Sequence, residues 1–175
     1  MPTNNSYFMT PQYFKDNTVV NGNVDDELIT PFIIIAENQN IERVIGTALF
    51  DELVDQIEDY KENSTPIDPN NIILLEKYIN PALLQWTMFH SLPFLNYKLT
   101  NKTVAKKNSD NSDSSDVGEI SYLRNVVSNN AEYLSTRLTN FLKENKDTYP
   151  LFGLPGTGCD TIKPSDDNYF SGFQL

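Results

Sequence analysis

The sequence contains only one cysteine, one histidine and one tryptophan among its 175 residues. The single Cys159 excludes a framework of disulfide bonds within the chain, and it is typical of a protein that folds in a reducing compartment. No apolar run approaches the roughly 18 residues that a membrane helix needs. The first residues also lack the basic and then apolar order of a signal peptide. The sequence therefore predicts neither a disulfide-stabilised secreted domain nor a membrane protein.

Basic residues are also scarce, because 13 lysines and arginines stand against 24 acidic residues and the net charge is −11. The imbalance is greatest in residues 1–70, which carry 13 acidic and 3 basic side chains. Such a charge disfavours non-specific binding to nucleic acid or to an anionic membrane. The exception is one cluster of cations, which consists of Lys98, Lys102, Lys106 and Lys107.

Residues that could form a catalytic or metal site are few. His90 has no second histidine and no neighbouring cysteine, whereas a zinc site or a catalytic triad needs such partners. Asp51, Asp55 and Asp59 recur every four residues, but a helical di-metal site would also need a Glu-x-x-His motif, which is absent. A solvated helix face, or a face directed at a basic partner, explains these carboxylates better. We expect no catalytic residue, no metal site and no cofactor, and hence no enzyme.

Helical periodicity is the main positive signal, and it is densest in residues 71–99. Asn71 can cap the start of this segment through its side-chain oxygen. Pro81 lacks a backbone N–H and clashes with the preceding turn, so we expect a kink or a restart near Asn80. The residues that follow are apolar on nearly all sides, as in a buried central helix, and Pro93 is expected to end it.

Further helical segments are predicted around this central one. The first begins near Thr30 as cap with Pro31 at the first helical position, and it fades into residues 37–40. A second helical turn spans residues 41–45, and Gly46 ends it as a left-handed C-cap. A longer helix spans residues 47–61, and the last runs from Asp116 to near Asn145. The apolar stripe of the last helix steps by three or four residues. It consists of Ile120, Leu123, Val127, Ala131, Leu134, Leu138 and Phe141.

The remaining segments are polar or rich in turn-forming residues. Residues 96–107 alternate apolar and polar side chains around Asn101–Lys102, which predicts a short β-hairpin. Residues 108–116 are low in complexity and predict a mobile loop. The sequence thus predicts a mainly α-helical bundle of about four to five helices over residues 28–152, with extended arms at 1–27 and 153–175.

Two sets of residues are candidates for contacts with a partner. The four clustered lysines could protect an edge strand, or could form a basic ribbon that meets the acidic first third of a second copy. The carboxy-terminal arm contains too much proline and glycine for a helix, yet it ends in large apolar side chains. These are Tyr169, Phe170, Phe173 and Leu175. The arm could dock in a groove of a neighbour or fold back on its own domain.

The order of these elements resembles the head–tail connector (adaptor or neck-ring) proteins of tailed bacteriophages, and most of all those of the crAss-like phages. The resemblance spans about residues 28–152. It is carried by LITPFIIIAENQNIERVIGTALFDELVDQI, by LLEKYINPALLQWTMFHSLPFL, by YKLTNKTVAKKNSD, and by a long helix that ends in NKDTYPLF. It implies a small helical domain without catalytic residues.

The resemblance also implies a structural virion protein. Copies would form a dodecameric ring below the portal protein, assembled in the bacterial host cytoplasm. The ring would join the head to the next neck or tail ring protein and extend a channel through which DNA passes as cargo, with no membrane and no cofactor involved. Terminal arms suit such assembly, and an acidic surface suits a channel in which DNA must not stick. The alternatives are a non-enzymatic protein-binding or regulatory module of the host cytoplasm, and a small enzyme with an unrecognised site.

Overall fold

The computed structural model describes residues 8–20, 24–95, 97–99, 104–106, 117–154, 156 and 161–164. This part of the chain is mainly helical, as the sequence predicts. The α-helices are α1 (Pro11–Asp16), α2 (Asp26–Ala36), α3 (Glu42–Ile45), α4 (Thr47–Asn63), α5 (Pro69–Leu74), α6 (Asn80–Leu95) and α7 (Val117–Glu144). Two π-helical turns, η1 (Glu37–Ile41) and η2 (Leu75–Ile79), join α2 to α3 and α5 to α6 without a break. The described residues therefore form five continuous helical segments.

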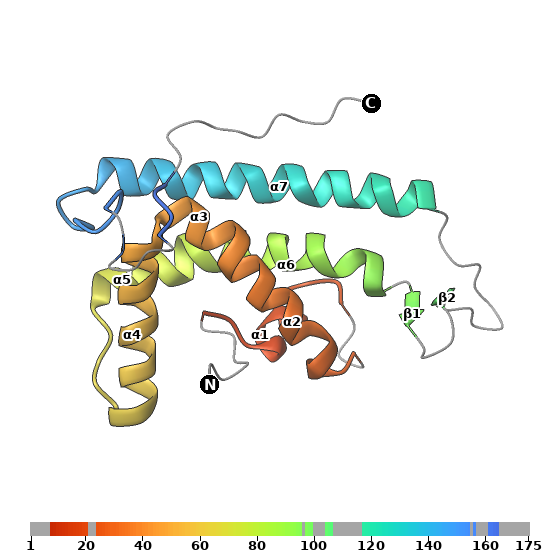
Figure 1. Cartoon of the computed structure of the whole chain (residues 1–175), viewed down its shortest axis with the longest axis horizontal. Helices are drawn as coiled ribbons and strands as arrows, with labels where there is room; N and C mark the ends of the chain where they lie inside the picture. The colour runs from red at the N-terminus through yellow and green to blue at the C-terminus, as the bar shows by residue number, and fades with distance from the viewer. Residues whose placement is uncertain are drawn as a thin grey trace.

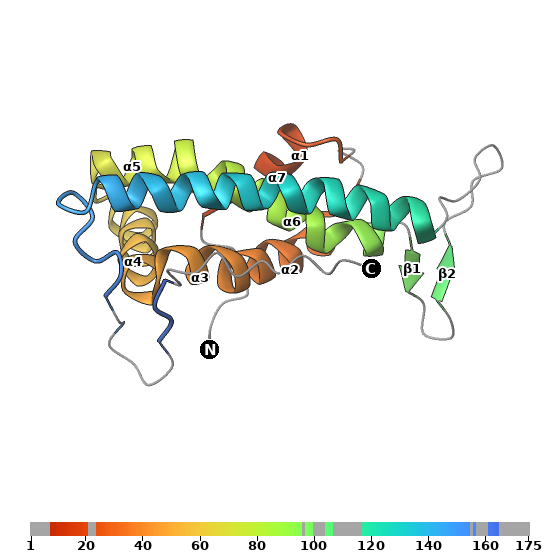
Figure 2. The same cartoon turned by 90° about the horizontal axis from the view of Figure 1, so that it is seen from above.

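The segments are arranged along one long axis (Figures 1 and 2). Helices α6 and α7 lie side by side along this axis, and α2 packs against the other side of α6. Helix α4 projects across the axis at one end of the molecule, whereas the strands β1 and β2 lie at the opposite end. One end of the molecule therefore carries the helix α4, and the other carries the strand pair.

The hydrophobic core lies between these helices, and Trp86 and Leu138 are buried in it, as predicted. The Trp86 indole N–H donates a hydrogen bond to the Ser135 hydroxyl over 2.9 Å, which satisfies a buried donor at the α6–α7 interface. Tyr78 and Phe141 stack with ring centroids 3.9 Å apart. Apolar packing and one buried hydrogen bond thus fix α7 on the central segment.

The amino-terminal region differs from the extended arm predicted for residues 1–27. Within the described residues 8–20, Thr10 caps α1 by accepting a hydrogen bond from the Tyr13 N–H, and Pro11 takes the first helical position. Phe14 is fully buried in the core. The Phe8 N–H donates to a carboxylate oxygen of the buried Glu37 over 2.8 Å. Residues 8–20 therefore pack against their own domain.

The predicted start at Thr30 is wrong, because α2 already begins at Asp26 and holds Pro31 in its interior. Pro31 lacks the N–H that would bond to the Glu27 carbonyl four residues earlier. The Thr30 hydroxyl donates to the Asp26 carbonyl over 2.8 Å, which adds a side-chain hydrogen bond to the turn beside the proline. Thr30 followed by Pro31 therefore does not mark the start of this helix.

The central segment is helical from Pro69 to Leu95, and its predicted boundaries need two corrections. Asp68 rather than Asn71 caps it, by accepting from the Asn70 N–H over 2.7 Å. The restart expected near Asn80 is present, because the π turn η2 ends at Ile79 and α6 begins at Asn80. Pro93 lies in the last turn of α6 rather than after it.

The boundaries of α4 and α7 agree with the prediction to within two residues, although the cap residue Asp116 lies outside the described chain. The helical segment before α4 does end at Gly46, and its φ of 84° is positive as predicted. Its ψ of 151° is extended, however, so Gly46 is not a left-handed helical cap. The extended ψ turns the chain into α4.

The two strands are β1 (Tyr97–Leu99) and β2 (Val104–Lys106), which pair antiparallel with Tyr97 opposite Lys106 and Leu99 opposite Val104. Residues 100–103, which would form the connecting turn, lie outside the described residues. The complete hairpin over residues 96–107 therefore stays a prediction, and so does the mobile loop at 108–116.

Candidate interaction surfaces

The predicted contact residues fall mostly outside the described part of the chain. Lys98 lies in β1 and Lys106 lies in β2. Outside the described residues lie the other six, Lys102, Lys107, Tyr169, Phe170, Phe173 and Leu175. The structure thus places two of the lysines in one strand pair, at the end of the molecule away from α4.

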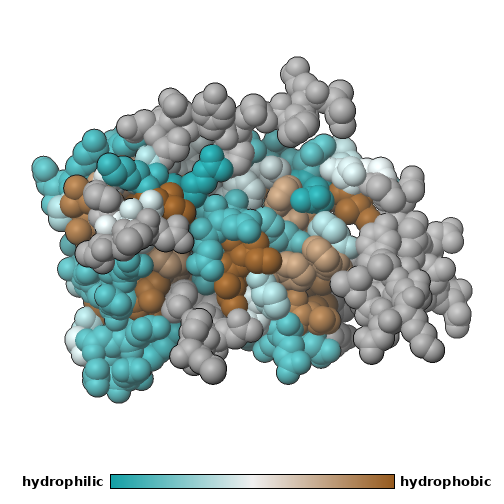
Figure 3. Space-filling model, viewed as in Figure 1, coloured by the Kyte–Doolittle hydropathy of each residue, from teal (hydrophilic) through white to brown (hydrophobic). Residues whose placement is uncertain are grey.

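An acidic face covers the solvent side of α4. Asp51, Asp55, Glu58 and Glu62 are exposed, and their spacing of four, three and four residues places them on one side of the helix. The free end of α4 is coloured as hydrophilic in Figure 3. Partial burial, and next the nearby carboxylate of Asp55, raise the pKa of Asp51. Negative charge is therefore crowded on this face.

The row Asp51, Asp55 and Asp59 does not converge on a metal site. Within the described ranges, no group of three or more His, Cys, Asp or Glu side chains is placed to hold a metal ion. The Asp59 carboxylate accepts a hydrogen bond from the Asn63 amide over 2.6 Å. Hydrogen bonds from Asn63 and Thr65 lower the pKa of Asp59. The row is a solvated helix face.

His90 is half-buried and serves the packing of α6. Its Nε2 lies 2.8 Å from the side-chain oxygen of Asn40, which joins α6 to η1. Burial, and next the positive charge of Arg124, lower the pKa of His90. The Arg124 guanidinium lies 4.3 Å from the centre of the Phe89 ring, beside the histidine. His90 is therefore a neutral side chain at pH 7 with a structural hydrogen bond.

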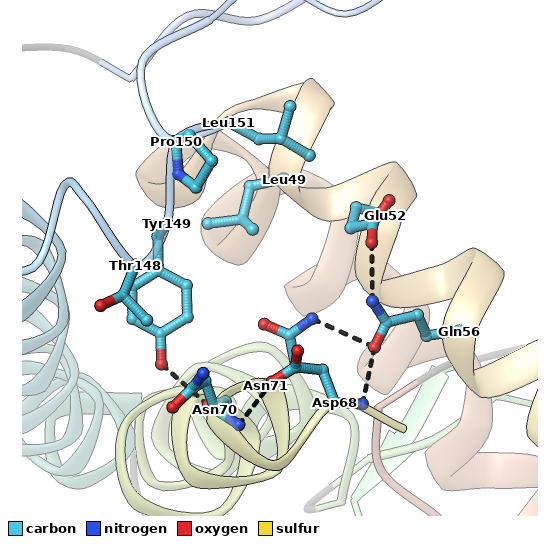
Figure 4. A pocket seen from close by; sticks show the side chains of 10 residues that line it. All are labelled: Leu49, Glu52, Gln56, Asp68, Asn70, Asn71, Thr148, Tyr149, Pro150 and Leu151. Atoms are coloured by element: carbon cyan, nitrogen blue, oxygen red, sulfur yellow. Dashed lines mark hydrogen bonds between the residues drawn. The ribbon is translucent and has the colours of Figure 1, made fainter. Parts of the chain in front are cut away.

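A small pocket of about 160 Å³ lies where α4, α5 and the turn after α7 meet (Figure 4). Its lining is polar along α4, and Gln56 is the centre of the hydrogen bonds. The Gln56 amide donates to Glu52 over 2.6 Å, and its oxygen accepts from the Asp68 N–H and the Asn71 amide. These groups form hydrogen bonds with one another, so the pocket is a polar contact region between α4 and the start of α5.

Tyr149 lines the same pocket from the turn that follows α7. Its hydroxyl donates to the Asn70 carbonyl over 2.8 Å, across 79 residues of sequence. Burial, then the negative charge of Asp68 and then Tyr78 raise the pKa of Tyr149, so the hydroxyl stays protonated and can donate. The turn after α7 is thereby fixed to the start of α5.

The outer face of α7 carries an apolar stripe that the sequence analysis missed. Tyr122, Val126 and Tyr133 are 69%, 41% and 71% exposed. They follow one another by four and seven residues, so they share one side of the helix, opposite the buried Ala131 and Leu138. This spacing was visible in the sequence beside the core stripe. We call these three residues the α7 stripe.

A shallow pocket of about 320 Å³ continues the α7 stripe toward the carboxy-terminal end of the helix. The Arg137 guanidinium lies 4.9 Å from the centre of the Tyr78 ring at its wall. Aromatic rings and a cation line the pocket together. The lining residues are Tyr78, Tyr133, Thr136, Arg137, Asn140, Phe141 and Glu144.

The described part of the carboxy-terminal arm forms a clip on the start of α4. The Thr47 N–H donates to the Ile162 carbonyl over 3.0 Å, and the Ile162 N–H donates to the Thr47 hydroxyl over 2.8 Å. The Thr47 hydroxyl in turn donates to Glu42 over 2.7 Å. A Cβ atom on Gly46 would lie 2.8 Å from Pro164. Residues 161–164 thus dock on their own domain.

Comparison with known proteins gives a family for most of the chain. The model of a protein family described as "Family of unknown function (DUF6712)" matches residues 41–162, more than half of the sequence. The chain belongs to this family. No curated protein and no solved structure matches it. Among the described residues, no helix combines the length and the apolar character that crossing a bilayer requires.

The DUF6712 region coincides with the part of the fold that the clip closes. It begins at Ile41, the last residue of η1, and ends at Ile162, which pairs with Thr47. The acidic face of α4, the two strands and the α7 stripe all lie within this region, whereas α1 and α2 precede it. All three candidate surfaces are therefore features of the DUF6712 part of the chain.

Proposed function

We propose that this chain is a structural virion protein that forms a ring below the phage portal, joins the head to the tail and extends the DNA channel. One observation supports this function above all: the acidic face of α4 and the lysine-bearing strands lie at opposite ends of the long axis. Surfaces of opposite charge at the two ends favour a head-to-tail contact between copies, and such contacts close into a ring when the rotation fits.

The finer parts of the proposal follow from the resemblance and the charge. The ring is dodecameric, like the portal, and binds the portal on one side and the next neck or tail ring protein on the other. Lys98, Lys102, Lys106 and Lys107 on a complete hairpin meet the acidic face of α4 in the next copy. Tyr169, Phe170, Phe173 and Leu175 contact a neighbour. The net charge of −11 keeps passing DNA from binding, and the protein acts without catalytic residues or cofactor.

Charge reversal tests the proposal directly. The purified chain is expected to form closed rings in native mass spectrometry and electron microscopy, and fewer at high salt because screening weakens contacts between exposed charges. Changing Lys98, Lys102, Lys106 and Lys107 to glutamate should abolish rings while circular dichroism shows an unchanged helical content. The matched control reverses four other lysines, with the same change in net charge. These are Lys61, Lys77, Lys143 and Lys146.

Two results would contradict the proposal. A chain that stays monomeric at every concentration and salt would favour a regulatory binding module of the host cytoplasm. Rings that persist after the hairpin reversal would show that the clustered lysines only solvate a strand edge. Rings that are lost equally in the control would show that net charge, and not this cluster, governs assembly.

A further inference from the structure

The α7 stripe leaves large side chains exposed on the longest helix of the fold. Tyr122 and Tyr133 are each about 70% exposed, and they lie on the side of α7 opposite Leu138, which faces the core. Single exposed apolar residues are common, but a row of them that runs into an aromatic pocket is typical of an interaction site. The row together with the pocket calls for an occupant that is elongated and rich in aromatic residues.

One segment of this chain has that chemistry. Eleven residues follow Pro164, with the sequence SDDNYFSGFQL, and four of them are large and apolar. Fully extended, they reach at most about 36–40 Å. The α7 stripe and its pocket, from Tyr122 to Phe141, extend over about 28 Å of helix. The carboxy-terminal segment, residues 165–175, is therefore long enough to cover them.

The same geometry disfavours binding of this segment to the α7 stripe of its own chain. Pro164 is held on Gly46, beside α3, and α3 contacts α7, whereas the α7 stripe lies on the side of α7 away from the core. To reach the stripe, the segment would first have to pass around a helix about 10–12 Å wide, which takes about 16–19 Å. That path uses nearly half of its length. A second copy can present its segment without this detour.

We propose that the α7 stripe and its pocket bind the carboxy-terminal segment, residues 165–175, of a second copy of this chain. The inference rests on the proposed ring, because it names the surface that receives the arm. The segment lies along α7 as an extended peptide, and its aromatic side chains fill the pocket beside Tyr78 and Arg137. The clip at Ile162 fixes the point from which each arm leaves its own copy.

Disulfide trapping in the full-length chain tests the inference. Cys159→Ser removes the native cysteine. One tagged chain then carries Tyr133→Cys, and a second chain with a different tag carries Phe173→Cys. Mixing the two under mild oxidation should give a disulfide-linked heterodimer in high yield. In the matched control, Glu27→Cys on the exposed side of α2 replaces Tyr133→Cys and should give at least tenfold less product.

A third chain that carries both Tyr133→Cys and Phe173→Cys shows whether the segment docks on its own α7 or on that of a second copy. If a disulfide within one chain still forms rapidly when the protein is diluted, the segment covers its own α7 and the inference is wrong. Absence of a disulfide in both the mixture and the double variant would also overturn it. If the unmodified chain forms rings but no disulfide is trapped, the proposed function stands and the docking inference fails. If pairs are trapped but no closed rings form, the proposed ring is refuted and the docking inference stands.

Discussion

Trp86 and Leu138 illustrate how single side chains hold the long helix α7 in place. Both are buried, and the indole N–H of Trp86 finds its partner in Ser135, one turn before Leu138. Removing the methyl groups of a fully buried leucine loses transfer free energy and leaves a cavity. The stability of the whole domain therefore depends strongly on this short stretch of α7.

Leu138→Ala is expected to lower the free energy of unfolding by about 2–5 kcal/mol, because the packed site cannot collapse fully around a smaller side chain. Urea unfolding followed by circular dichroism measures the change. Leu123→Ala on the same helix is the matched control, since Leu123 is 46% exposed and should cost less than about 1 kcal/mol. Equal losses in the two variants would mean that α7 packs through another face.

The sequence could predict that Trp86 and Leu138 are buried, because helical periodicity identifies the core side of a helix. It could not predict the partner of the indole. Ser135 is 49 residues away from Trp86 and reads as an ordinary polar helix residue until α6 and α7 are packed together. Its burial follows from tertiary contacts alone.

At the scale of elements, the turn between α3 and α4 sets the direction of the acidic helix. Gly46 has a positive φ, and its missing side chain leaves room for Pro164. The first N–H groups of a helix lack partners within the helix, and Ile162 supplies one for Thr47. The backbone conformation of Gly46, its close packing against Pro164 and the hydrogen bond of Thr47 thus all act at the start of α4.

Gly46→Ala should lower the free energy of unfolding by about 1–3 kcal/mol for the combination of positive φ and extended ψ alone, with a further loss from the contact with Pro164. Thermal unfolding of the purified chain measures the total. Adding Pro164→Ala should restore only the part that is due to the contact. Full recovery in the double variant would show that the backbone conformation at Gly46 costs nothing.

The proline residues show why element boundaries were harder to predict than elements. Pro31 was expected at the first helical position, yet α2 begins at Asp26 and holds it in its interior. Near Pro81 the expected restart is present, since η2 ends at Ile79 and α6 begins at Asn80. The same residue type thus lies inside one helix and beside the start of another, and a proline in the sequence does not reveal which.

At the scale of the whole molecule, the chain is an elongated helical body with unlike ends. The helical fold was predictable because apolar residues recur every three to four positions over most of its length. The docking of Ile162 on Thr47 was not predictable, since no local pattern marks a contact across 115 residues. The carboxy-terminal arm therefore has two parts: a clip that belongs to the domain, and residues 165–175 beyond it.

Deleting residues 165–175 should leave the melting temperature of the monomer nearly unchanged but prevent assembly. Deleting residues 161–175 should also remove the clip and cost about 1–3 kcal/mol, since each of its two hydrogen bonds is worth about 0.5–1.5 kcal/mol. Differential scanning calorimetry and native mass spectrometry measure the two effects. Equal melting temperatures for both deletions would show that the clip does not stabilise α4.

The distance in sequence between Thr47 and Ile162 also orders events during synthesis of the chain. Residues emerge from the amino terminus at about 5–20 per second, so roughly 6–23 seconds separate these two partners. Throughout this interval α4 can form as a helix, but the Thr47 N–H lacks its partner Ile162 and the clip does not yet fix the angle between α3 and α4. The acidic helix is therefore among the earliest elements to be made and among the last to be fixed in direction.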